Sequence, residues 1–205
     1  MSTRVVAIRR GMSLEYFTVA WNLLEAAVAL ACGAVAGSIA LTGFGLDSLI
    51  EVSSGGILLW RLSADSDDVR RETVERSALK LVGLSLLLLA AYVAGDSAFS
   101  LVRREGPDRS LPGIALAIVS LIAMPLLARA KRRVASTLGS SALHADSRQT
   151  DICAYLSAIL LLGLLLNAFF GWLWADPLAG LAMVPLIAYE GSEALRGKTC
   201  CQHCA

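Results

Sequence analysis

Six long apolar segments constrain the fold of this chain more than any other feature of its sequence. A helix needs about 20 residues to cross a hydrocarbon core about 30 Å thick. Inside that core a segment must satisfy its own backbone hydrogen bonds, which favours helices. The segments cover residues 14–36, 38–60, 77–102, 112–130, 149–170 and 174–195. We therefore predict an all-α integral membrane protein, built as a bundle of six transmembrane helices.

Composition supports this class and excludes others. Charged residues make up 17% of the 205 residues, whereas roughly a quarter is usual for a soluble domain. The net charge is +1 and no face is rich in lysine or arginine, so we expect no nucleic-acid partner. The chain has no Walker loop, nucleophile elbow or HExxH motif, and we therefore expect neither an enzyme nor a chain that hydrolyses ATP.

Turn residues and polar stretches separate the six segments. Gly37 and Ser38 form the first turn, the charged residues 61–76 form a solvated loop, and Pro177 suits an early helical turn. We predict one transmembrane domain over residues 1–196, a short Cys/His-rich cytoplasmic tail over residues 197–205, and no soluble domain. In the tail, soft ligands for zinc or copper(I) are available from Cys200, Cys201, His203 and Cys204.

Basic residues set the orientation, because segments on the cytoplasmic side carry more lysine and arginine. With both termini inside, the outer segments hold only Arg103, Arg104 and Arg109. The inner segments then hold Arg4, Arg9, Arg10, Arg61, Arg70, Arg71, Arg76, Lys80, Arg129, Lys131, Arg132, Arg133, Arg196 and Lys198. We expect the bacterial inner membrane, with both termini cytoplasmic.

The second segment carries two carboxylates where a lipid-facing helix would carry none. Asp47 and Glu51 are four residues apart and so share one helix face. At about 1.5 Å per residue from Ser38, Asp47 lies about 14 Å deep, near mid-bilayer. A charge there costs at least about 2.5–3.5 kcal/mol, and no lysine or arginine lies at comparable depth in the predicted spans. The pair is therefore a candidate cation or proton site, and the alternative is a polar pair for helix packing. Asn22 and Glu25 of the first segment are candidates to reach the same cavity.

The fifth segment begins with polar residues on two faces. Asp146, Gln149 and Cys153 follow the i, i+3, i+7 spacing of one helix face, and Ser147 and Asp151 share another. These side chains either extend the cation site or cap a helix that begins in the cytoplasm.

Four stretches of the chain together resemble the cation diffusion facilitator family. They are "WNLLEAAVAL", "GSIALTGFGLDSLIEVSSG", "LHADSRQTD" and "WADPLAGLAMVPLIAYEG". The resemblance implies six spans, cytoplasmic termini, a possible homodimer, and exchange of divalent zinc, manganese, iron or cobalt for protons. It also implies a transport site that joins two residues of span two, spaced by four, to a HxxxD pair on span five.

Asp47 and Glu51 match the first half of that site, whereas span five departs from HxxxD. Aligning "ADS" with the family's "ADA" places Gln149 and Cys153 at the His and Asp positions. Aligning Asp151 with the family's Asp places Ser147 at the His position instead. We prefer the first register, which predicts a metal site of Asp47, Glu51, Asp146, Gln149 and Cys153.

This ligand set suits a borderline divalent ion, because carboxylates and a thiolate both bind zinc. Zinc is the transported ion that we expect first, with manganese, iron or cobalt as alternatives, and no organic cofactor is expected. Without the family's histidine, the exchanged protons would be carried by Asp47, Glu51 or Cys153.

The sequence thus predicts a proton-coupled divalent-cation antiporter that works by alternating access. One alternative is a membrane protein that binds, senses or regulates through metal without transporting it, having lost HxxxD. Another is a thiol or redox protein built on the cysteine-rich tail.

Overall fold

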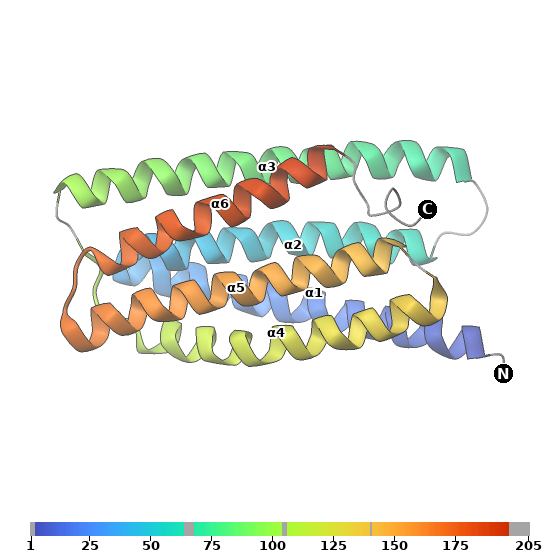
Figure 1. Ribbon diagram of the computed structural model, residues 1–205, viewed down its shortest axis with the longest axis horizontal. Coiled ribbons are helices and arrows are strands. Elements are labelled where there is room, and N and C mark those ends of the chain that lie inside the picture. The colour runs from blue at the N-terminus through green and yellow to red at the C-terminus, as the bar shows by residue number, and fades with distance from the viewer. Residues whose placement is uncertain (1–2, 64–67, 104–105, 140, 197–205) are drawn as a thin grey trace.

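The structure is a computed structural model that describes residues 3–63, 68–103, 106–139 and 141–196. These residues form six helices and no strands (Figure 1). The helices are α1 (Thr3–Ala36), α2 (Ile39–Ser63), α3 (Asp68–Arg103), α4 (Leu111–Leu138), α5 (Ser141–Phe170) and α6 (Ala175–Leu195). The prediction of an all-α membrane bundle is confirmed.

Helices α2 and α5 run through the middle of the bundle. Helix α3 packs mainly on α6, and α1 and α4 pack on each other and on the central pair (Figure 1). Helix α2 contacts α1, α3, α5 and α6, so residues on its inward faces meet side chains from most of the molecule. The beginning of α1 and the end of α6 lie at the same end of the bundle, as an even number of crossings requires.

Four helices have the length and composition of membrane spans on their own. The apolar stretches are Val6–Ala36, Lys80–Arg103, Leu111–Leu138 and Asp146–Phe170. Helices α2 and α6 are not in this group, and they carry the buried acids Asp47, Glu51, Asp176 and Glu190. Buried acids are not confined to α2 and α6, because α1 also buries Glu15 and Glu25.

Several helices extend well beyond the predicted spans. Helix α1 begins at Thr3 rather than near residue 14, and α4 continues to Leu138 rather than 130. Hydropathy identifies only the part of a helix that fits the hydrocarbon core, whereas helical hydrogen bonding continues into the polar region. At the end of α4, Gly139 adopts the left-handed conformation (φ 64°) that closes many helices.

Asp176 of α6 joins the ends of two helices. Its carboxylate accepts hydrogen bonds from the Ser38 hydroxyl at 2.5 Å and from the backbone N–H of Ile39 at 2.9 Å. A carboxylate at a helix N-terminus satisfies free N–H groups and interacts favourably with the helix dipole. The predicted turn is present, since Gly37 has a φ of 68°, and Pro177 lies in the first turn of α6 as expected.

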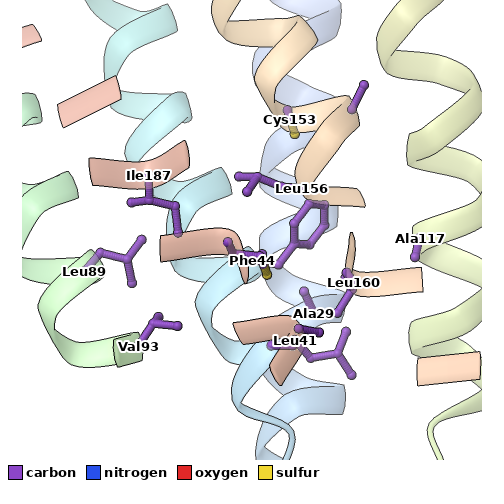
Figure 2. Packing of buried hydrophobic residues seen from close by; sticks show 14 of the residues in the cluster. Ala29, Leu41, Phe44, Leu89, Val93, Ala117, Cys153, Leu156, Leu160 and Ile187 are labelled. Atoms are coloured by element: carbon purple, nitrogen blue, oxygen red, sulfur yellow. The ribbon is translucent and has the colours of Figure 1, made fainter. Parts of the chain in front are cut away.

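A hydrophobic cluster fills the bundle on the Gly37 side of the carboxylates. Phe44, the largest fully buried side chain, lies between the central helices with Leu41, Leu156 and Leu160 (Figure 2). Leu89 and Val93 of α3 and Ile187 of α6 extend the cluster to the other side of α2.

Candidate functional site

Asp47 and Glu51 lie one turn apart on α2 and face the interior of the bundle. Their exposed fractions are 1% and 7%. Asn22 of α1 donates a hydrogen bond to Glu51 Oε2 at 2.7 Å. Among the described residues, neither oxygen of Asp47 nor Oε1 of Glu51 has a hydrogen-bond partner. Buried polar atoms are rarely left unpartnered, so these oxygens are available to a ligand.

Glu25 of α1 is a hydrogen-bonded carboxylate that interacts electrostatically with both Asp47 and Glu51. It accepts hydrogen bonds from Ser48 of α2 at 3.0 Å and from Ser120 of α4. The Cys153 thiol of α5 lies 3.8 Å from the same carboxylate. Glu25 and Asn22, the candidate residues of the first predicted segment, therefore connect α1 to three other helices.

The predicted span-five ligands lie in three different environments. Gln149 faces α2 and accepts a hydrogen bond from Ser54, three residues beyond Glu51, at 3.3 Å. Cys153 is fully buried and is directed at Glu25. Asp146 forms an ion pair with Lys131 of α4, with Oδ2 2.5 Å from Nζ. The structure thus places Gln149 and Cys153 on the inward face of α5, and it places Asp146 in a different cluster.

The alternative register of span five consists of Asp151 and Ser147, which have partners on α4 and α5. Asp151 binds the Arg132 guanidinium through both oxygens, at 2.5 and 3.2 Å, on a partly exposed surface between α4 and α5. Ser147 donates a hydrogen bond to the backbone carbonyl of His144 at 2.7 Å. Asp151 and Ser147 thus make their hydrogen bonds with α4 and within α5, and the ligand register of span five stays a prediction.

A buried ion-pair cluster lies between α1, α4 and α5, and sequence reasoning did not find it. Lys131 Nζ lies 3.0 Å from Glu15 Oε2 as well as 2.5 Å from Asp146, and both Lys131 and Glu15 are fully buried. A Cβ atom at Gly55 of α2 would come within 2.8 Å of Glu15 Oε1, so α2 covers the cluster closely. Lys131 also interacts electrostatically with Glu51.

From the sequence, Lys131 counts among the basic residues of the cytoplasmic segments, because it lies one residue beyond the predicted span 112–130. The missing signal was periodicity. Ser120, Met124, Leu127 and Lys131 follow the i, i+4, i+7, i+11 spacing of one buried face of α4. Lys131 therefore belongs to the buried face of α4 and not to the exposed basic residues beside it.

Glu190 of α6 is another buried residue that the sequence analysis missed. It is 8% exposed, and neither carboxylate oxygen has a hydrogen-bond partner among the described residues. It interacts electrostatically with Asp47 and Glu51. Its position after the buried residues Met183 and Ile187 continues the inward face of α6 and could have indicated it.

In this conformation the carboxylates face a common region without closing on a common point. Within the described residues, no three side chains of His, Cys, Asp or Glu lie close enough to hold a metal ion together. Like charges in a medium of low dielectric constant repel strongly, which keeps such groups apart until a cation is between them.

Packed side chains lie on both sides of this region along the bundle axis. The cluster around Phe44 fills one side, and the ion pairs of Lys131 lie toward the other, next to Glu51.

The environment of Cys153 leads to a prediction. If the thiol binds the ion, as the sequence suggests, then Cys153→Ala weakens zinc binding by about tenfold, as for loss of one ligand-supporting group, and affects manganese less. Equilibrium binding of both ions to the purified protein measures this, with Cys32→Ala of α1 as the control. Equal affinities in Cys153→Ala and wild type would remove Cys153 from the ligand set and leave it as a packing partner of Glu25.

Two groups considered from the sequence lie outside the described residues. They are the cysteine-rich tail over 197–205 and the acidic residues at 65 and 67 of the loop before α3.

Comparison with known proteins agrees with this architecture. Residues 16–198 match the family model of the cation efflux transmembrane domain. The chain is also similar to the uncharacterized transporter sll1263 of Synechocystis sp., with 30% identity over 172 residues. That similarity covers 80% of this chain and 54% of the relative, so the chain spans about half the length of the relative that it matches.

Proposed function

Because the chain belongs to the cation efflux family, we propose that it moves a divalent metal cation across a membrane through a site centred on Asp47 and Glu51. The observation that supports this most directly is the pair of buried carboxylates on α2, three of whose four oxygens have no partner among the described residues. Ionisable groups inside a membrane are costly and usually mark an ion or proton pathway.

The ligands favour a divalent ion of hard or borderline character. Asp47 and Glu51 supply carboxylate oxygens, Gln149 lies near them on α5, and Cys153 adds a thiol if it turns from Glu25. Zinc accepts this mixture, whereas use of the oxygens alone favours manganese or iron. We propose zinc as the first ion to test. Asp146 would join the ligands only by leaving Lys131.

Coupling to protons follows from the same chemistry. A metal ion displaces protons from carboxylic acids when it binds, and the protons return when it leaves. With both termini on the cytoplasmic side, the Phe44 cluster closes the outer side and the Lys131 cluster lies toward the cytoplasm. Alternating access would then open these two barriers in turn.

The test is metal flux into sealed proteoliposomes containing the purified protein, with a metal-sensitive dye inside and an imposed pH gradient. We expect entry of at least one of zinc, manganese, iron or cobalt, faster than in protein-free vesicles, with protons moving the opposite way. Absence of both flux and binding for all four ions would overturn the proposal.

A metal-binding or sensing protein that does not transport is the second candidate. The observations that favour it are the departure of span five from HxxxD and the lack of a closed three-ligand group among the described residues. Binding at micromolar metal without flux in the same vesicles would support this candidate instead.

A further inference from the structure

Glu190 is a buried acid whose surroundings do not explain it. It lies on the inward face of α6, 8% exposed, and both carboxylate oxygens lack a hydrogen-bond partner among the described residues. A buried carboxylate without a partner is destabilising, and a glutamate retained for packing would be expected to have a donor.

The neighbours of Glu190 are the acids of the proposed transport site. Helix α6 packs on α2, and Glu190 interacts electrostatically with both Asp47 and Glu51. The buried cation nearest to this region, Lys131, is already bound by Glu15 and Asp146. Glu25 of α1 also interacts with Asp47 and Glu51, but Ser48 and Ser120 donate hydrogen bonds to it. The other three carboxylates, from two helices, have five of their six oxygens unpartnered within the described part of the chain.

We propose that Glu190 is a third carboxylate ligand of the transported ion, contributed by α6. This inference rests on the proposed function and extends the site beyond the span-two and span-five residues that the sequence indicates. A divalent cation supplies the positive charge that the three acids lack, and its binding draws together groups that repel each other without it. An additional carboxylate makes the ligand set richer in oxygen, which favours manganese relative to zinc.

The position of Glu190 also has a mechanical consequence. Helix α6 packs closely on α3, where Gly83 and Gly191 bring the two backbones together. A ligand on α6 would couple that helix pair to α2, so that release of the ion and movement of α3 and α6 occur together.

Metal binding to the 205-residue chain, purified in detergent, tests this proposal. Binding of Mn²⁺ is measured by the decrease in the electron paramagnetic resonance signal of unbound Mn²⁺, and binding of Zn²⁺ is measured by equilibrium dialysis. For Glu190→Gln we expect an affinity about 10- to 100-fold below wild type, as for loss of one charge-assisted interaction, and a larger loss for Mn²⁺ than for Zn²⁺. Glu190→Asp keeps the charge on a shorter side chain, and we expect an intermediate affinity.

Glu193→Gln is the matched control, because Glu193 lies one turn further on α6 and is partly exposed, 4.0 Å from Arg196. It should bind both ions as wild type does. Wild-type affinity in both Glu190 variants, alongside weakened binding in Asp47→Asn, would overturn the role of Glu190 and leave the proposed function intact. A wild-type protein that neither binds nor transports any of the ions would instead overturn the proposed function, and this inference with it.

Discussion

Replacing Asp47 with asparagine should abolish most metal flux while leaving the protein folded. The substitution preserves shape and removes only the charge that an ion would bind. At limiting metal we expect flux to fall by about 30-fold or more, which corresponds to one interaction with a charged group of about 2 kcal/mol. Because neither Asp47 oxygen has a partner among the described residues, no hydrogen bond of the folded state is lost, and the thermal stability of the metal-free protein should stay equal or rise.

The combination of these two results separates a transport role from a structural one. A polar pair that only holds helices together would lose stability on substitution and keep its ion selectivity. Flux in reconstituted vesicles and thermal unfolding of the same preparation measure both quantities. Asp96→Asn is the control, since Asp96 lies on α3 near Tyr92 and outside the proposed site. Wild-type flux in Asp47→Asn would exclude Asp47 as an ion ligand.

Local spacing predicts the pair of carboxylates on which the proposed site is centred. Asp47 and Glu51 lie in an apolar segment at i and i+4, and helical geometry alone places them on one face near mid-bilayer. Their burial and their unpartnered oxygens in the structure agree with that prediction. The six helices could also be predicted from the sequence, because their apolar segments are long and are separated by polar or turn-forming residues.

The partners of the pair could not be predicted in the same way, because they depend on which helices pack together. Periodicity could mark Glu190 and Lys131 as buried, but only the contacts of α6 with α2 and of α4 with α1 show what they face. Asp146 shares a helix face with Cys153, but it forms an ion pair with Lys131 of α4. Hydropathy also could not predict the burial of Lys131, because a predicted span is ended near the first basic residues.

Removal of the Lys131 charge is the substitution that we expect to destabilise the fold most. In Lys131→Met the side chain keeps similar length, but Glu15 and Asp146 lose the cation that lies 3.0 and 2.5 Å from them. Removing one partner of a buried ion pair lowers the free energy of unfolding by about 3–5 kcal/mol, because the remaining charge stays buried and unpaired. Here two carboxylates remain, and Glu15 is fully buried. We expect a large decrease in unfolding temperature and poor recovery of folded protein.

Restoring charge balance should recover most of the loss. In the triple variant Lys131→Met, Glu15→Gln, Asp146→Asn, no charge of the cluster remains, and neutral replacements of buried ion pairs are often tolerated. Arg133→Met is the matched single control, because Arg133 lies on an exposed face of the same helix. Thermal unfolding followed by size-exclusion chromatography in detergent ranks the four proteins. If Lys131→Met unfolds at the temperature of Arg133→Met, the cluster contributes nothing to the fold, and α1, α4 and α5 are held by apolar packing alone.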